Sequence, residues 1–228
     1  MSTWIQQRDR LYGTVLYLVA RLTSKTARFQ VSGSQYFQAA LSGERPTILT
    51  AWHGMTMMLA GFLLNQRDIS EVVLIIPGDR RGPVLDVFAR KLGATPFPMD
   101  LSGDASLSAA RKLAQLVRLI KAGHHGYITP DGPDGPAHVV KPGVVYLARK
   151  AQATILPVGA YTRHGYRQPR WDRYVVPYPF CRISVCFGPP LHVPEEVELM
   201  AATGPLTDTL HRVTMQAAAN YYEQRPGR

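Results

Sequence analysis

The chain has 228 residues, 46% of them hydrophobic and 18% charged, so one ample domain with a sizeable core is expected. Its net charge of +10 at pH 7 favours an anionic partner, namely nucleic acid, anionic lipid headgroups or an acidic carrier protein. Nucleic acid is the least favoured of these, because the sequence has no zinc-ligand spacing, helix-turn-helix signal or RNA-binding aromatic motif.

The first predicted element is a membrane-contact helix within residues 1–30. Its apolar run, residues 11–20, is shorter than the roughly 20 residues that a helix needs to span a bilayer. Trp4 lies near this run, and the basic residues Arg8 and Arg21 flank it. Such flanks are typical of a helix that lies in the membrane interface. The alternative is an ordinary core helix.

Strands and helices alternate through residues 31–228, which we expect to form one domain. The predicted strands are residues 47–51, 72–77, 127–129, 155–160 and 182–187. The predicted helices are residues 82–92, 105–122 with Asp104 as the N-cap, 142–151 and 205–222. This alternation predicts an α/β fold with a mixed or parallel sheet flanked by helices. Residues 163–179 are polar and aromatic, and we expect a loop there that covers a site or touches lipid.

A rigid loop follows the strand predicted at residues 127–129. Its sequence, with the end of the strand, is Tyr127-Ile-Thr-Pro-Asp-Gly-Pro-Asp-Gly-Pro136. Proline fixes φ and glycine accepts conformations that other residues cannot, so this loop is expected to have one shape. Asp131 lies where the strand ends. The loop is therefore either part of an active site or a plain strand-to-helix connection.

A second candidate position lies upstream, in the segment Thr50-Ala-Trp-His-Gly-Met55. His53 follows an apolar strand and precedes an apolar helix that begins near Gly54. In α/β folds the ends of strands are where ligands and catalytic groups gather. His53 is therefore a candidate functional residue, with a buried structural histidine as the alternative.

Taken in order, these segments resemble the glycerolipid, or lysophospholipid, acyltransferase superfamily. That superfamily has a histidine just after a strand, then a Phe-Pro-Glu-Gly-Thr-Arg type block and an apolar Ile-Val-Pro-Val type strand. Here the order is Trp52-His53-Gly54, Thr129-Pro-Asp-Gly-Pro133 and Ile155-Leu-Pro-Val158. The closer likeness is to an uncharacterised bacterial branch with Trp-His-Gly and Asp-Gly-Pro-x-Gly-Pro motifs. The resemblance covers residues 47–160.

The resemblance implies a single-domain fold of the glycerolipid-acyltransferase type. It also implies transfer of a fatty acyl group from acyl-carrier protein or acyl-CoA to a hydroxyl of a (lyso)lipid acceptor. Such a transfer needs a base for the hydroxyl proton and a group that orients the base. His53 is the predicted base, Asp131 is predicted to orient it or to bind the acceptor, and the Gly132-Pro133 turn is predicted to shape the site.

No cofactor and no metal are implied by the resemblance. The expected surroundings are an anionic membrane surface, with the protein peripheral on the cytoplasmic face of the inner (plasma) membrane. Nucleic acid is not an expected partner.

The chain departs from the superfamily pattern at two positions. The aspartate that usually stands five positions after the histidine is replaced by Met58, which cannot orient an imidazole. The orienting group must then be a carbonyl, a water or a carboxylate from elsewhere; Asp131 is the first candidate, and Asp86 or Asp79 the second.

The second departure is Asp134, which stands where relatives have an arginine. Arg80, Arg81 and Lys141 are predicted to supply the lost positive charge to a phosphate, since guanidinium groups bind phosphate oxygens with two parallel bonds. The alternative for each of them is solvated surface charge.

The methionines after His53, Met58 among them, suit an acyl-chain pocket, with a packed core helix as the alternative. The rival to an acyltransferase is a non-catalytic lipid-binding protein of the same fold that has lost the acid at position 58. A basic nucleic-acid-binding protein fits the charge alone.

Overall fold

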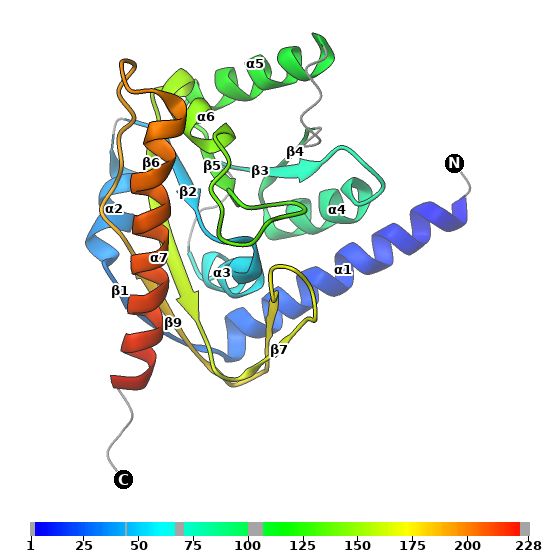
Figure 1. Ribbon diagram of the computed structural model, residues 1–228. Helices are drawn as coiled ribbons and strands as arrows, with labels where there is room; N and C mark the ends of the chain where they lie inside the picture. Colours follow the sequence, from blue (N-terminus) through cyan, green and yellow to red (C-terminus); the bar gives the residue numbers. More distant parts are fainter. Residues whose placement is uncertain (1–2, 44, 67–70, 100–106, 224–228) are drawn as a thin grey trace.

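The computed structural model describes residues 3–43, 45–66, 71–99 and 107–223, and helices cover both faces of its sheet (Figure 1). The large sheet has seven strands in the order β1-β9-β6-β2-β5-β3-β4. They are β1 (Arg28–Ser32), β2 (Thr47–Thr50), β3 (Val72–Pro77), β4 (Thr95–Met99), β5 (His125–Ile128), β6 (Thr154–Tyr161) and β9 (Arg182–Phe187). All neighbouring strands are parallel except β6 and β9, which are antiparallel.

The helices divide into two layers because of the order in which the strands are joined. They are α1 (Thr3–Thr26), α2 (Ser34–Ser42), α3 (Thr56–Leu63), α4 (Gly82–Leu92), α5 (Leu107–Lys121), α6 (Gly143–Ala151) and α7 (Leu199–Glu223). The connections β2 to β3 and β3 to β4 advance along the sheet, whereas β4 to β5 and β5 to β6 return. Since crossovers between parallel strands are right-handed, α3 and α4 lie on one face and α5 and α6 on the other. Contacts add α1 to the first layer and α7 to the second.

The core lies between these layers. The central strands are buried on both faces, as expected where helices cover both, and the side chains of Ile48, Ile155 and Val158 are almost completely buried. A smaller cluster joins α1 to α3 and α4 around Ala20, Met57 and Phe88. α1 is therefore fixed to the body of the protein along one side.

Most of the predicted elements are present. The strands at residues 72–77 and 182–187 and the helix at residues 82–92 have the predicted bounds, and the other strands differ by at most two residues at either end. The N-cap predicted at Asp104 lies outside the described residues. The last helix begins at Leu199 rather than at Pro205. Pro205 is exposed, so water can bond the carbonyl that the proline leaves unpaired.

Four strands and the helix α2 were missed, and the two edge strands among them were missed for physical reasons. β4 contains Pro96 and Pro98, which argue against a strand, but β4 is an edge strand, where proline is tolerated. β1 is the opposite edge strand and lacks a fully buried face, so its pattern is weak. The predicted loop at residues 163–179 contains a small hairpin, β7 (Gly165–Arg167) and β8 (Val175–Pro177).

The carboxyl ends of β2, β3 and β5 meet at one edge of the sheet, because these strands are neighbours and parallel. His53 follows β2, the turn with Arg80 and Arg81 follows β3, and the loop with Asp131 follows β5. The topology thus brings the predicted site residues to a common edge, as is usual for ligand sites in such sheets.

Candidate active site

His53 begins a short 3-10 helix, His53–Met55, directly after β2 and Ala51-Trp52. Its carbonyl accepts a hydrogen bond from the Thr56 hydroxyl at 2.9 Å. Gly54 lies against the hairpin: a Cβ added there would lie 2.3 Å from the Asp172 carbonyl oxygen. Glycine at this position therefore lets the hairpin backbone approach the histidine.

The imidazole of His53 is paired with a carboxylate from that hairpin. Nδ1 of His53 lies 2.6 Å from Oδ2 of Asp172, whose side chain is completely buried, while the His53 side chain is 24% exposed. An ionised carboxylate can only accept a hydrogen bond, so this contact favours the tautomer that has its proton on Nδ1 and its lone pair on Nε2. This is the arrangement that a general base requires: one nitrogen oriented and the other free.

Other groups of the hairpin hold the Asp172 carboxylate. Arg170 Nη2 donates to Oδ2 at 3.4 Å, and the Tyr174 amide donates to Oδ1 at 3.3 Å. The Trp171 and Tyr174 rings flank the imidazole, with centroids 5.5 and 5.7 Å from that of His53. Burial raises the pKa of the Tyr174 hydroxyl, so this residue stays neutral beside the pair.

Asp131, the first predicted partner of the imidazole, contacts the backbone of His53 instead. Its Oδ1 accepts from the His53 amide at 2.9 Å and its Oδ2 from the His138 amide at 3.1 Å. The side chain is almost completely buried. The carboxylate therefore joins the residue that follows β2 to the rigid loop that follows β5, and the orienting contact predicted for it is made by Asp172.

The Gly-Pro turn lies next to the His53 ring. A Cβ added at Gly132 would lie 3.1 Å from Cδ2 of His53, the carbon next to Nε2. The half-buried Lys141 donates from Nζ to the Gly132 carbonyl at 3.0 Å. Pro133 follows in this turn, and its peptide bond with Gly132 is cis. The structure thus brings Gly132, Pro133 and Lys141 together next to His53.

The same loop also contacts the hairpin. Gly135 has φ +80°, and a Cβ there would lie 2.9 Å from the Trp171 ring. A left-handed glycine therefore allows Trp171 to lie over the loop while it flanks His53.

The two arginines after β3 have different environments. Arg81 pairs with Asp79 at 2.7 Å and with Asp134 at 2.8 Å. These hydrogen bonds raise the pKa of the Arg81 guanidinium and lower the pKa of both carboxyls. Asp134, the departure from the family pattern, thus neutralises the neighbouring arginine. Arg80 is exposed. Of the two, Arg80 is the one whose charge is more available to an anion.

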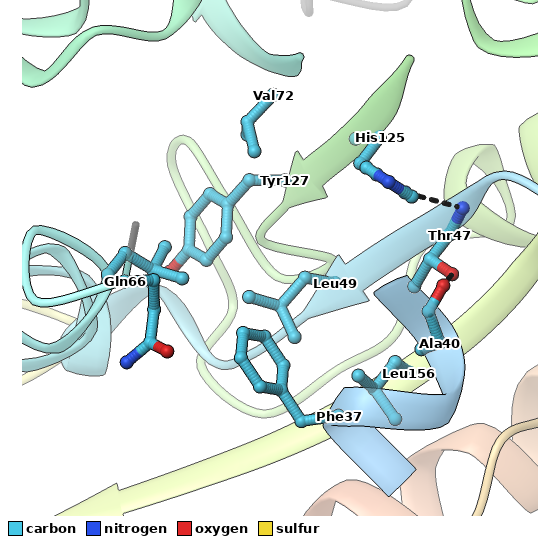
Figure 2. Close-up of a pocket in the computed structure, with 11 residues that line it drawn as sticks. Phe37, Ala40, Thr47, Leu49, Gln66, Val72, His125, Tyr127 and Leu156 are labelled. Atoms are coloured by element: carbon cyan, nitrogen blue, oxygen red, sulfur yellow. Dashed lines mark hydrogen bonds between the residues drawn. The ribbon is translucent and has the colours of Figure 1, made fainter. Parts of the chain in front are cut away.

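Met58 lies in α3 with its side chain 2% exposed, as part of the main core. Two small apolar hollows adjoin this layer, each with a cavity volume of about 30 Å³. Tyr127, Leu63 and Val72 line both of them, and Thr56 lines the one nearer His53. Figure 2 shows the other hollow, where Tyr127 lies among Leu49, Phe37 and Gln66. Burial raises the pKa of Tyr127, whose hydroxyl donates to Thr56 at 3.3 Å.

The sequence-based prediction missed Asp172, Trp171 and Tyr174. One signal was available: in the segment Arg170-Trp-Asp-Arg173, Asp172 is the sole carboxylate of a stretch rich in arginine and aromatic residues. The pairing was not predicted because Asp172 lies 119 positions after His53 in the sequence. The two residues come together through the position of the hairpin in the fold.

Within the described part of the chain, no three His, Cys, Asp or Glu side chains gather in a way that could hold a metal ion. No helix in that part is both long enough and apolar enough to cross a bilayer.

Comparison with known proteins places the fold. No protein-family model matches the chain. It is 25% identical over 148 residues to the uncharacterized protein RP090 of Rickettsia prowazekii (strain Madrid E), and the match spans 65% of each protein. The crystal structure of the 1-acyl-sn-glycerophosphate (LPA) acyltransferase PlsC from Thermotoga maritima is similar, with a TM-score of 0.57 and 14% identity over 97% of this chain and 85% of that chain. The predicted glycerolipid-acyltransferase-like fold is confirmed.

Proposed function

We propose that this protein is an acyltransferase that moves a fatty acyl group from acyl-carrier protein or acyl-CoA to a hydroxyl of a (lyso)lipid acceptor. The observation that carries the proposal is the His53–Asp172 pair, with its 2.6 Å contact, at the carboxyl edge of a sheet whose fold is similar to that of PlsC. The fold alone does not imply chemistry, whereas an oriented imidazole with one free nitrogen does.

The proposed reaction uses Nε2 of His53 as the base. It takes the proton of the acceptor hydroxyl as the oxygen attacks the thioester carbonyl carbon, and Asp172 stabilises the imidazolium that forms. The tetrahedral intermediate then collapses, the carbon–sulfur bond breaks, and the leaving thiolate receives the proton from Nε2. The products are an ester and a free thiol, so atoms and charge balance.

The other residues have positioning and binding roles in this proposal. Asp131 fixes the His53 backbone, and the Gly132-Pro133 turn is held by Lys141, with Gly132 next to Cδ2 of the imidazole, where a larger residue would crowd the ring. Arg80 is the candidate group for a phosphate of donor or acceptor. Arg81 serves the structure of the turn, because two carboxylates already occupy it.

The acyl chain is proposed to lie beside α3, where the two hollows meet at Tyr127. Each hollow is far smaller than a fatty acyl chain, so side chains of this layer would have to move for a chain to enter. The buried methionines of α3, Met57 and Met58, suit such repacking because their side chains are unbranched and flexible.

A peripheral position on the cytoplasmic face of the inner (plasma) membrane is proposed from α1. The side of α1 that packs on the protein includes Gly13, Leu16 and Ala20. The apolar side chains on the opposite side are exposed; they are Trp4, Leu11, Val15, Leu18 and Leu22. Spacings of three, four and seven residues place these five on one face of the helix. Exposed apolar faces of this kind, with basic residues around them, suit an anionic bilayer surface.

The rival function, lipid binding without catalysis, was suggested by the missing acid at position 58. The missing acid no longer favours a non-catalytic protein, since Asp172 provides the carboxylate that Met58 cannot. Turnover still separates the two functions, because both would bind lipid and one alone would consume an acyl thioester.

The test is an assay of purified protein with acyl-CoA and acyl-carrier-protein thioesters against a panel of lysolipids, following thiol release and the ester product. His53→Ala should lower turnover by about 10²-fold or more, the usual scale for losing a general base. His192→Ala, at an exposed histidine, is the matched control and should leave turnover unchanged. A folded His53→Ala variant with wild-type turnover contradicts the assigned base. Absence of turnover by the wild-type protein with every substrate favours the lipid-binding function.

A further inference from the structure

The segment between β6 and β9 is rich in basic and aromatic residues. In residues 162–181 the charged residues are Arg163, Arg167, Arg170 and Arg173, with Asp172 as the single acid, and that acid is buried. Tyr166, Tyr178 and Phe180 of this segment are exposed, Phe180 by 75%. We propose that the β7–β8 hairpin docks on the surface of an anionic phospholipid bilayer beside α1, so that the carboxylate that orients His53 is carried by a membrane-bound element. The role of this docking in catalysis rests on the proposed function, but the docking itself can be tested without measuring turnover.

The hairpin lies on the same side of the molecule as α1. Tyr174 belongs to the cluster in which Leu16, Tyr17 and Ala20 of α1 pack against α3 and α4. At the other end of the segment, the Arg28 amide just after α1 donates to the Cys181 carbonyl at 2.9 Å. Figure 1 shows the hairpin, labelled β7, next to α1 and away from α7. Both α1 and β8 pack on α3, so the hairpin and α1 lie in the same outer layer of the protein.

The chemistry of the combined surface selects a bilayer as the partner. Arginine guanidinium groups bind phosphate oxygens, and tyrosine is enriched at the depth of lipid headgroups, where one end of the ring is apolar and the other wet. A nucleic acid would use the arginines but would leave the exposed Leu11, Val15 and Leu18 of α1 in water. An anionic bilayer would contact both the arginines of the hairpin and the exposed apolar side chains of α1.

Docking of the hairpin on a bilayer would also affect the His53–Asp172 pair. Asp172 lies on the hairpin between Arg170 and Arg173, and the Tyr174 ring lies between the α1 cluster and the His53 ring. A bilayer that holds the hairpin and α1 together also holds the carboxylate against the imidazole. A lipid acceptor could then reach His53 from the membrane without crossing water.

Vesicle binding tests the docking. Sedimentation with vesicles of phosphatidylcholine, and of phosphatidylcholine with phosphatidylglycerol, should show tighter binding to the anionic vesicles at low salt. Arg163→Gln/Arg173→Gln should weaken binding to anionic vesicles by about 30-fold, since each surface arginine contributes roughly fivefold. Tyr178→Ser/Phe180→Ser should weaken it by about tenfold or more. The matched control is Met215→Ser, which removes an apolar side chain of similar exposure, 72%, from α7 on the opposite face.

A second measurement does not depend on loss of binding. An environment-sensitive fluorophore on Tyr178→Cys should shift to the blue with anionic vesicles, whereas the same label on Met215→Cys should not. Wild-type protein that stays in solution overturns the proposal, as do hairpin variants that bind like wild type, or a Met215→Ser control that loses as much binding. Tyr178→Ser/Phe180→Ser should keep wild-type turnover on short-chain, water-soluble substrates. If no variant and no wild type turns over any substrate, the proposed function fails while the docking result stands.

Discussion

Oδ2 of Asp172 lies 2.6 Å from Nδ1 of His53, although 119 positions separate the two residues in the chain. In the pattern that the sequence resembles, the acid stands five positions after the histidine, on the next helix. Here that helix position is filled by Met58 in the core, and a hairpin brings a carboxylate to the imidazole from a distant part of the sequence.

Asp172→Asn should lower turnover by about 10²-fold or more with little change in KM, because an amide can present its NH₂ group to Nδ1 and so favour the wrong tautomer. The change should also distort the pH profile of kcat/KM, which a loss of mere packing would not do. Steady-state turnover over a pH series checks this, with Asp208→Asn, an exposed carboxylate of α7, as control. Undiminished turnover in folded Asp172→Asn would remove the carboxylate from the mechanism.

Asp131→Asn should lower both stability and turnover. The carboxylate accepts from two backbone amides, His53 and His138, and an asparagine can accept from one of them while its NH₂ group faces the other. A buried N–H left unpaired costs about 1–3 kcal/mol of the free energy of unfolding. Asp134→Asn, at an exposed carboxylate of the same loop, should cost about 1 kcal/mol or less. Denaturant unfolding of both variants checks this, and equal stabilities would contradict the backbone role of Asp131.

The sequence predicted the layers of this fold well, because β3, β9 and α4 carry strong local signals: apolar runs and a glycine stop at Gly93. His53 and Asp131 were placed together for the same reason, since each follows a central strand. The Asp172 contact could not be predicted, because it depends on the path of an irregular segment and on a close approach at Gly54. Edge strands and hairpins of this kind have weak patterns, and their position is decided by tertiary packing.

Gly135→Ala should lower turnover, because the added Cβ would lie 2.9 Å from the Trp171 ring, which flanks His53. The positive φ of +80° adds a backbone cost of about 1–2 kcal/mol. Gly123→Ala is the matched control: it has a φ of +104° and no atom within 4 Å of the added Cβ. Both variants should lose stability in thermal unfolding, and turnover should fall in Gly135→Ala alone. Equal turnover in the two would show that the Trp171 contact does not position the site.

The free energy of unfolding should fall as the pH drops from about 7.5 towards 5.5. Burial lowers the pKa of His125 below its usual 6.5, with His124 lowering it further and Glu71 opposing. The unfolded chain therefore binds more protons in the window below 6.5, and stability is lost there. Protonation also removes the acceptor at Nδ1 that the Thr47 amide uses at 3.2 Å.

His125→Asn tests this pH dependence, because the asparagine oxygen can replace Nδ1 as acceptor but does not titrate. Its unfolding free energy should fall less steeply over the same pH range than that of the wild type. Part of the slope should remain, since burial also lowers the pKa of His138. The unfolding free energy of both proteins is measured by denaturant titration at each pH. If it depends on pH to the same extent in both, His125 does not contribute to the pH dependence.

Met58→Asp should not rescue Asp172→Asn. Restoring an acid five positions after the histidine recreates the family spacing, but Met58 is 2% exposed in a cluster with Leu59 and Phe62. A carboxylate there loses its water without a partner, which costs several kcal/mol or forces the group to stay protonated. We therefore expect the double variant to be less stable than Asp172→Asn and no more active. Met58→Leu, which keeps the core apolar, should cost less than about 1.5 kcal/mol. Turnover and unfolding of these variants decide the matter: recovered activity in the double variant would mean that position 58 can face the imidazole and that either location can hold the acid.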